Sequence, residues 1–355
     1  QNQMTEFITL RKPDDFHLHV RDDEVLKCVL PHVARYFKRA MIMPNLSPPV
    51  SNIEMALDYK RRIGDAVQNL DFNPKMTLYL TPFTKPEDIK AARNEDSVIA
   101  MKYYPAGATT NSEYGVRDIY QCRKVLDEMQ KIGLPLSIHG EIVDPDIDVF
   151  DREQVFVDTI LSKLVADFPQ LKIILEHVST IEGVQFVEET GDNVAATITA
   201  HHMLLNRNHM LLNGIKSYLF CFPILKSEKH RKAVLKAAVS GNKKFFLGTD
   251  SAPHEIAKKT GLVNAGGIYS SFNALPIYIE LFKQQNALEK FEAFSSQFGA
   301  DFYRLDHNEE RIKLERQQVE IPEVLTINQL QLIPLKSGET INWRLVDSET
   351  EFSVP

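Results

Sequence analysis

Cysteine is scarce in this chain, and its placement excludes two kinds of site. Only three cysteines occur among 355 residues, at Cys28, Cys122 and Cys221. They are far apart, odd in number and form no Cys-x-x-Cys pair, so neither a disulfide framework nor a thiolate zinc site is expected. Free thiols are typical of a reducing compartment, and we therefore expect a cytoplasmic protein.

Long apolar runs and an excess of positive charge are also missing. No apolar run approaches the ~20 residues that a membrane helix needs, and no stretch has the pattern of a signal peptide. The net charge is -7 at pH 7, whereas nucleic-acid binding usually shows as a basic stripe. Short basic runs at 60–62 and 229–232 fall in helix-like segments, where a solvated helix face explains them. We therefore expect a small-molecule substrate and neither a membrane nor a nucleic acid as partner.

The sequence instead contains short β-rich runs that alternate with longer helical patterns. Such alternation is typical of βα units around a parallel sheet. About eight strands can be counted, the number that closes a TIM (β/α)8 barrel. A doubly wound open sheet is the alternative, but no glycine-rich phosphate loop follows the first strand to support it. We predict an α/β protein with a single barrel domain over about 8–310. A short C-terminal extension, about 311–355, is expected to pack outside the barrel.

Residues that can bind metal ions end several of the predicted strands. In a β/α barrel the C-terminal strand ends form one rim, and active sites lie there. Each residue alone has a commoner explanation, such as a buried histidine or a helix cap. Their coincidence on one rim predicts a metal site. The residues are His17 and His19 on the first strand, Lys102 on the fourth, His139 on the fifth, His177 on the sixth and Asp250 on the eighth.

The residue types indicate two ions rather than one. Side chains two apart on a strand point to the same face, so His17 and His19 can face one ion. Zinc prefers histidine nitrogen and carboxylate oxygen, and four histidines with one aspartate are too many for a single open site. An ammonium group at Lys102 would be disfavoured beside two dications. A deprotonated amine could react with carbon dioxide and become a bridging carbamate.

The local sequence resembles a known family. The motifs are PDDFHLHVR (13–21), MPNL (43–46), KYYP (102–105), IHGE (138–141), NRNHM (206–210) and LGTDSAPH (247–254). With the rim residues, they resemble the amidohydrolase superfamily and, within it, the dihydroorotases of the shorter bacterial type. The matches run through most of the chain.

The resemblance implies a reaction and a complete metal centre. The reaction is the reversible hydrolysis of the cyclic amide of (S)-dihydroorotate to N-carbamoyl-L-aspartate, in pyrimidine biosynthesis, with Asp250 moving the proton. Two Zn2+ ions would be bridged by a hydroxide and by Lys102 modified to N6-carboxylysine. A homodimer is implied by the family alone. The implied ligands are His17, His19, Lys102 and Asp250 for one ion, and Lys102, His139 and His177 for the other.

The resemblance also implies contacts to the substrate carboxylate. Arg21 lies on the same strand face as His19 and can form a bidentate pair with a carboxylate. Asn45 at the end of the second strand, and His254 one turn after Asp250, would bind the same group. This set predicts an acidic substrate.

The remaining implied contacts lie in two loops. Backbone groups near Phe222 and Ala265 would contact the ring amide edge, although 258–268 departs from the family pattern. The small polar loop 106–111 would act as a lid that excludes water, with Thr109 and Thr110 touching the substrate.

Two other functions compete with this interpretation. A hydantoinase or allantoinase would usually carry a longer N-terminal β-domain, whereas about a dozen residues precede the first predicted barrel strand. A non-catalytic barrel that serves as a scaffold would lose metal ligands, and all of them are present here. Three further histidines, His201, His202 and His209, follow the seventh strand, and we expect structural roles for them.

Overall fold

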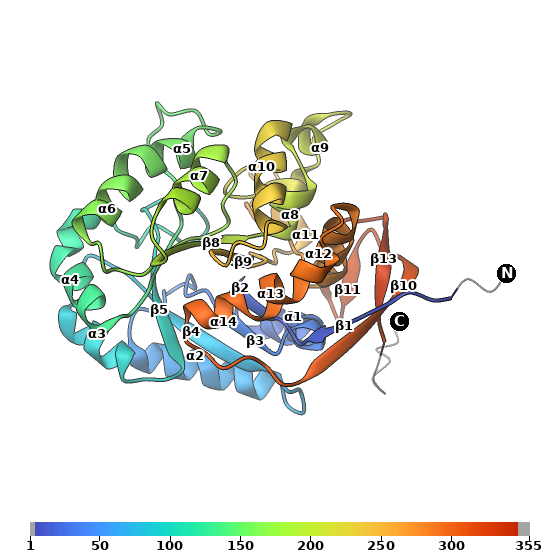
Figure 1. The fold of residues 1–355 in the computed structure, drawn as a ribbon, viewed down its shortest axis with the longest axis horizontal. Helices are drawn as coiled ribbons and strands as arrows, with labels where there is room; N and C mark the ends of the chain where they lie inside the picture. Colours follow the sequence, from blue (N-terminus) through green and yellow to red (C-terminus); the bar gives the residue numbers. More distant parts are fainter. Residues whose placement is uncertain (1–3, 347–355) are drawn as a thin grey trace.

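A closed barrel of eight parallel strands forms the centre of the computed structural model, which describes residues 4–346 (Figure 1). Neighbouring strands follow the order of the chain, from β2 to β9. The predicted TIM barrel is therefore confirmed. The strands are β2 (Asp14–Leu18), β3 (Arg39–Ile42), β4 (Asn73–Tyr79), β5 (Val98–Tyr103), β6 (Leu136–Ile138), β7 (Ile173–Leu175), β8 (Val194–Ile198) and β9 (Phe245–Leu247).

Helices connect the strands and lie outside them (Figure 1). The α-helices are α1 (Asp23–Tyr36), α2 (Ile53–Ala66), α3 (Pro86–Arg93), α4 (Arg123–Ile132), α5 (Arg152–Phe156), α6 (Ser162–Asp167), α7 (Ile181–Glu189), α8 (Ala200–Leu204), α9 (Arg207–Leu211), α10 (Glu228–Ala238), α11 (Ile256–Lys259), α12 (Ala274–Gln284), α13 (Phe291–Ser296) and α14 (Phe298–Phe302). Short turns of other helix types are η1 (Ile119–Cys122), η2 (Val157–Leu161), η3 (Ser217–Leu219) and η4 (Leu288–Lys290). Because helices cover the sheet, strands such as β5 are buried at every position and read as apolar runs.

The barrel closes between β2 and β9 through a buried carboxylate. Oδ1 of Asp15 accepts hydrogen bonds from the backbone N–H of Thr249 at 2.9 Å and of His17 at 3.1 Å, and Oδ2 accepts one from the Thr249 hydroxyl at 2.6 Å. The N–H of Asp250 donates to the carbonyl of His17 at 2.8 Å. These bonds fix the two ends of the sheet together beside the predicted metal site.

Four of the predicted strands end before a residue that we expected at their ends. β2, β6, β7 and β9 stop at Leu18, Ile138, Leu175 and Leu247, so the loops that follow contain His19, His139, His177 and Asp250. At His177 and Asp250 the backbone is left-handed, with φ angles of 40° and 49°, so neither residue can belong to a strand.

The C-terminal extension forms a small antiparallel sheet with the start of the chain. β1 (Phe7–Arg11) pairs with β10 (Arg311–Glu320), which pairs with β13 (Thr340–Val346), and β11 (Leu325–Ile327) pairs with β12 (Leu330–Leu332). β1 therefore lies in this sheet, and the barrel begins at β2 rather than near residue 8. Nε1 of Trp343 donates to Glu280 of α12 at 2.8 Å, which attaches the sheet to the outside of the barrel. Residues 347–355 of the predicted extension lie outside the described residues.

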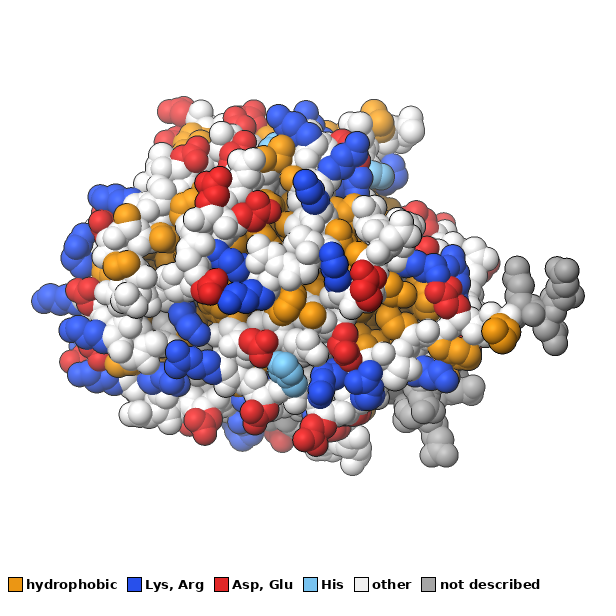
Figure 2. All heavy atoms as spheres, in the orientation of Figure 1, with side chains coloured by type: hydrophobic (Ala, Val, Ile, Leu, Met, Phe, Trp, Pro, Cys, Tyr) orange, Lys and Arg blue, Asp and Glu red, His pale blue; other side chains and the backbone are white. Residues whose placement is uncertain are grey.

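Three features of the described residues concern the expected partners and location: the helices, the surface charge and the cysteines. None of the helices within residues 4–346 is long and apolar enough to cross a membrane. On the face in Figure 2, acidic side chains are interspersed among the basic ones. All three cysteines are buried and free.

Candidate active site

The rim histidines and the aspartate converge at the C-terminal end of the barrel. Nε2 of His17 lies 3.2 Å from Oδ1 of Asp250, and Nε2 of His19 lies 3.0 Å from the same oxygen. Ligand atoms of His17, His177 and Asp250 all lie within 4.8 Å of one another. The ring centroids of His139 and His177 are 4.6 Å apart. Residues from four different βα units therefore meet at one point, as the sequence predicts.

Several nitrogen atoms in this cluster are buried without a partner. Within residues 4–346, Nδ1 of His19, Nδ1 of His177 and Nζ of Lys102 make no hydrogen bond. Each such orphan costs about 1–3 kcal/mol. Metal ions would compensate this cost, and nitrogen with carboxylate oxygen is the donor set that zinc prefers. The residues present therefore fit a metal centre.

Lys102 has the chemistry that a carbamate requires. It lies on β5 with its side chain fully buried, and its Nζ is 5.1 Å from the ring centroid of Tyr104. Burial lowers the pKa of Lys102 to about 8, although the charges of Glu176 and Asp250 act in the opposite direction. An appreciable fraction of the amine is therefore uncharged just above neutral pH, and the uncharged amine is the form that reacts with carbon dioxide.

Asp250 is held ionised in a strained loop. Burial raises the pKa of Asp250, but its contacts with His17 and His19 lower it more, so the pKa lies well below its usual value. The left-handed backbone of a residue other than glycine is uncommon and stores strain, and such strain gathers at functional sites. The ionised carboxylate of Asp250 can therefore act as a metal ligand.

Two buried glutamates orient the histidines from behind. Oε2 of Glu176 lies 2.7 Å from Nδ1 of His17 and accepts from the hydroxyl of Thr197 at 2.6 Å. Oε1 of Glu141 lies 2.7 Å from Nε2 of His139. A carboxylate in this position decides which ring nitrogen carries the proton and leaves the other free for a metal. Sequence reasoning missed both glutamates, although each lies within two residues of a predicted ligand.

Glu176→Gln is expected to weaken metal binding by about 10- to 100-fold. Three donors converge on the two carboxylate oxygens of Glu176, because the Ser137 hydroxyl also donates to Oε1 at 2.7 Å. The amide of glutamine would turn its own N–H group towards one of these donors. The measurement is the metal retained after dialysis against a chelator of known affinity. Glu188→Gln, at an exposed position of α7, is the control. Equal retention in both variants would show that Glu176 does not position His17.

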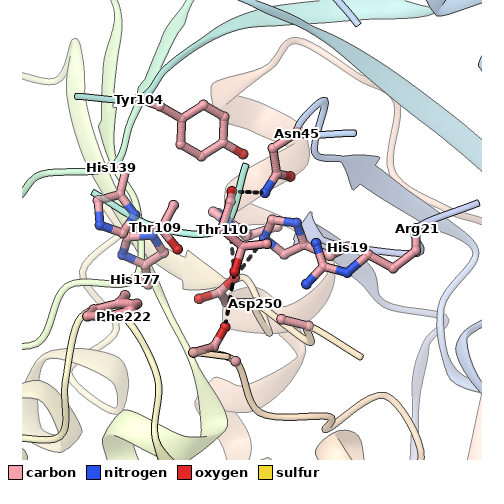
Figure 3. A pocket seen from close by; sticks show the side chains of 14 residues that line it. His19, Arg21, Asn45, Tyr104, Thr109, Thr110, His139, His177, Phe222 and Asp250 are labelled. Carbon is pink, nitrogen blue, oxygen red and sulfur yellow. Dashed lines mark hydrogen bonds and ion pairs between the residues drawn. The ribbon is translucent and has the colours of Figure 1, made fainter. Parts of the chain in front are cut away.

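Arg21 places an unpaired cation beside the metal ligands. Its side chain lines the pocket, and no carboxylate lies within 4.0 Å of it among residues 4–346. Nε of Arg21 donates to the carbonyl of Pro253 at 3.2 Å. The backbone carbonyl of Arg21 accepts a hydrogen bond from the Tyr59 hydroxyl. In Figure 3, Arg21 and His19 stand on one side of the pocket, opposite His139 and His177. A half-buried guanidinium without an acidic partner indicates an anionic ligand.

His254 lies next to Arg21 behind the pocket wall. Its Nε2 is 3.1 Å from a guanidinium nitrogen of Arg21 and 3.1 Å from the carbonyl of Gly266. One nitrogen cannot accept from Arg21 and donate to Gly266 at once, so the tautomer decides which contact forms. Burial, followed by the charge of Arg21, lowers the pKa of His254 to about 2. The ring is therefore neutral. It can form a hydrogen bond, but it does not act as a second cation that would compete with Arg21 for an anionic ligand.

The loop that we predicted to be a lid is hydrogen-bonded to Asn45 beside the pocket. Nδ2 of Asn45 donates to the carbonyl of Thr110 at 2.9 Å, and Nδ2 of Asn111 donates back to the carbonyl of Asn45 at 3.0 Å. Thr109 and Thr110 line the pocket and reach its centre in Figure 3. The cavity that remains has a volume of about 20 Å³. Asn45 therefore holds the loop in place by hydrogen bonds, and it also lines the pocket.

The prediction for Ala265 needs correction. Its N–H donates to the carbonyl of Lys258 at 2.9 Å and its carbonyl accepts from Nζ of Lys259 at 2.6 Å, so both backbone groups are already bonded. Gly266 and Gly267 line the pocket instead, as does the predicted Phe222. Ala265 itself does not line the pocket, because the loop turns its neighbour Gly266 towards the cavity.

Sequence reasoning also missed other pocket residues. Tyr104 lines the cavity, its hydroxyl is buried, and this oxygen makes no hydrogen bond within the described part of the chain. Its place two residues after Lys102 is the signal that could have found it. Ala252 lines the cavity too, two residues after Asp250.

The histidines after the seventh strand lie outside the pocket. Nδ1 of His202 bonds the Thr199 hydroxyl at 2.7 Å and its Nε2 donates to the carbonyl of Pro223 at 2.9 Å. Nδ1 of His209 accepts from the N–H of Asn206 at 3.0 Å at the start of α9. His201 has no such partner among the residues described. His201, His202 and Cys221 lie close enough together to hold a metal ion. Both ring nitrogens of His202 are already hydrogen-bonded, however, so the group does not offer three free ligand atoms.

Known proteins share this arrangement over nearly the whole chain. The sequence pattern of the amidohydrolase family matches residues 7–315. A dihydroorotase from Acaryochloris marina is 50% identical over 341 residues, which cover 96% of this chain and 99% of that protein. The chain belongs to the dihydroorotases of the amidohydrolase family. The crystal structure of dihydroorotase from Saccharomyces cerevisiae in complex with 5-fluoroorotic acid is 33% identical, with a TM-score of 0.89 and coverage of 96% of this chain and 98% of that one.

A more distant structure separates fold from function. L-Hydantoinase from Arthrobacter aurescens is 14% identical with a TM-score of 0.78, which shows a common fold alone. Membership of the dihydroorotases makes this chain a hydrolase of a cyclic amide in a metal-dependent family. The hydantoinase-like and scaffold alternatives are not favoured.

Proposed function

We propose that this chain catalyses the reversible hydrolysis of (S)-dihydroorotate to N-carbamoyl-L-aspartate, the third step of de novo pyrimidine (UMP) biosynthesis. One observation carries the proposal: a cluster of metal-ligating side chains lies beside the unpaired guanidinium of Arg21 in one closed pocket. The cluster suits hydrolysis of an amide, and the guanidinium suits a substrate that carries a carboxylate.

The metal centre in this proposal holds two zinc ions. Bound there, the ions would polarise the amide carbonyl and lower the pKa of a water molecule. The uncharged amine of Lys102 would add to carbon dioxide and lose a proton, which converts a cation into a bridging anion. The ligands would be His17, His19, Lys102 and Asp250 for one ion, and Lys102, His139 and His177 for the other.

The protein's own groups would orient the substrate and move the proton. Arg21 would form a bidentate pair with the carboxylate, and Asn45 and His254 would add hydrogen bonds. Asp250 would accept the proton of the attacking water and deliver it to the ring nitrogen as the C–N bond breaks. The Thr109–Thr110 segment would exclude bulk water while the lid is latched.

Assembly and location extend the proposal. We infer a homodimer from the family and a cytoplasmic location from the reduced cysteines. We also infer that the barrel and the outer sheet form one domain, since Trp343 of β13 is fully buried against α12.

A direct assay tests the proposed reaction. Zinc-replete protein is supplied with dihydroorotate and, separately, with carbamoyl aspartate, alongside hydantoin and allantoin. We expect turnover of the first two and far slower turnover of the neutral cyclic amides. Faster turnover of hydantoin or allantoin would contradict the proposed substrate, and no turnover of any of them would favour a scaffold.

Arg21→Met is expected to raise KM for dihydroorotate by about 10- to 100-fold, since a charge-assisted hydrogen bond contributes about 1.5–3 kcal/mol. The metal content should not change, because Arg21 is not a ligand. Steady-state kinetics with metal analysis check both statements, with Arg61→Met on the exposed face of α2 as control. Loss of zinc with an unchanged KM would make Arg21 a structural residue.

A further inference from the structure

A buried lysine joins the two backbone segments that form one wall of the pocket. Nζ of Lys259, the last residue of α11, donates to the carbonyl of Phe220 at 2.9 Å and to the carbonyl of Ala265 at 2.6 Å. These carbonyls belong to segments 45 residues apart in the chain, which also meet directly, because the N–H of Gly267 donates to Phe220 at 2.9 Å. Lys259 therefore fixes the distance between the segments 220–222 and 265–267.

This arrangement is costly by itself. The side chain of Lys259 is 4% exposed, and no carboxylate lies within 4.0 Å of its ammonium among residues 4–346. Burial lowers its pKa to about 8. Apart from the two carbonyl groups, the ammonium approaches only the Phe220 ring among the residues described, at 5.9 Å from its centroid, whereas buried charges are normally paired. A role at the nearby site would account for it.

The joined segments face the ligand space. Phe222, Gly266 and Gly267 all line the pocket. The two segments are in close contact, because a Cβ atom on Gly266 would lie 2.5 Å from the ring of Phe222. The carbonyl of Gly266 also approaches Nε2 of His254 at 3.1 Å. A small change in spacing would therefore move several groups that face the ligand.

We propose that Lys259 is a positioning residue that clamps the segments 220–222 and 265–267 at the spacing at which their backbone groups bind the planar amide edge of an acidic cyclic substrate. The inference rests on the proposed function and adds to it a residue that never touches the substrate.

A purely structural cross-link makes a different prediction. Loss of such a link would lower the free energy of unfolding and leave KM unchanged. A clamp that sets binding geometry changes KM, and the affinity for a ring ligand, more than kcat. The metal content separates both from damage to the metal centre, because Lys259 contacts no ligand of that centre.

The test compares Lys259→Met and Lys259→Gln with Lys258→Met, whose side chain is exposed on the same helix. Zinc-loaded proteins are assayed for kcat and KM with dihydroorotate, for binding of 5-fluoroorotic acid and for metal content. We expect Lys259→Met to raise KM and the Kd of 5-fluoroorotic acid at least fivefold, with kcat within threefold and full metal content. Lys259→Gln, which keeps a donor but not the charge, should show a smaller rise, and Lys258→Met should match the wild type.

A KM within twofold of wild type in Lys259→Met, or a lower kcat with lost metal, would overturn the clamp. If that variant is not recovered folded, Lys259→Gln decides in the same way, with a KM within twofold of wild type as the contrary result. Failure of the proposed function would appear differently, as absent turnover of dihydroorotate by the wild type itself.

Discussion

Lys102→Ala is expected to lower kcat/KM for dihydroorotate by at least about 10³-fold, because in the proposed two-metal centre this change would remove the bridging anion and destabilise both ions. The side chain is fully buried, and its Nζ makes no hydrogen bond within residues 4–346. Metal content should fall with activity. Kinetics and metal analysis of the same preparation are the measurement.

Small carboxylic acids provide a control for this variant. The cavity left by the lysine side chain could admit acetate or propionate, which would replace the carbamate oxygens. We expect partial recovery of metal binding and activity in their presence, and none with chloride at the same ionic strength. Near-normal zinc content and activity in Lys102→Ala without any additive would contradict the carbamate assignment.

Asp250→Asn is expected to reduce kcat by about 10²–10⁴-fold, the usual contribution of general acid–base catalysis. Asparagine tolerates the left-handed backbone found at this position, φ 49°, so the loop should keep its shape. It cannot accept the proton, however, and as a neutral group it binds metal less well than a carboxylate.

The comparison for this variant is Asp192→Asn, at an exposed salt bridge with Lys243. We expect the control to stay within twofold of wild type. Pre-steady-state analysis of dihydroorotate hydrolysis would locate the defect in the chemical step. If Asp250→Asn retained full kcat, another group would have to carry the proton.

The barrel and the cluster of histidines and Asp250 at its rim could be predicted because both follow from local patterns. Alternating β and helical runs define the topology, and that topology places residues such as His17 and His177 on one rim wherever they occur in the chain. The pairing of β1 with β10 was not predictable in this way, because it depends on contacts between segments about 300 residues apart.

Loop geometry limited the prediction of the substrate side. Which of two adjacent residues faces the cavity depends on loop conformation, so Gly266 lines the pocket and Ala265 does not. Tyr104 and Glu176 were missed because a buried tyrosine or glutamate has no sequence pattern that separates a site from a core. Lys259 appears as a clamp only when the carbonyl groups around it are known.

The most direct test of the metal centre is an anomalous difference map collected at the zinc edge from crystals of the zinc-loaded protein. We expect two peaks about 3.5–4 Å apart among the four histidines and Asp250, with continuous density from Lys102 reaching both. A single peak, or none, with an unmodified Lys102 would contradict a two-metal site bridged by a carboxylated lysine.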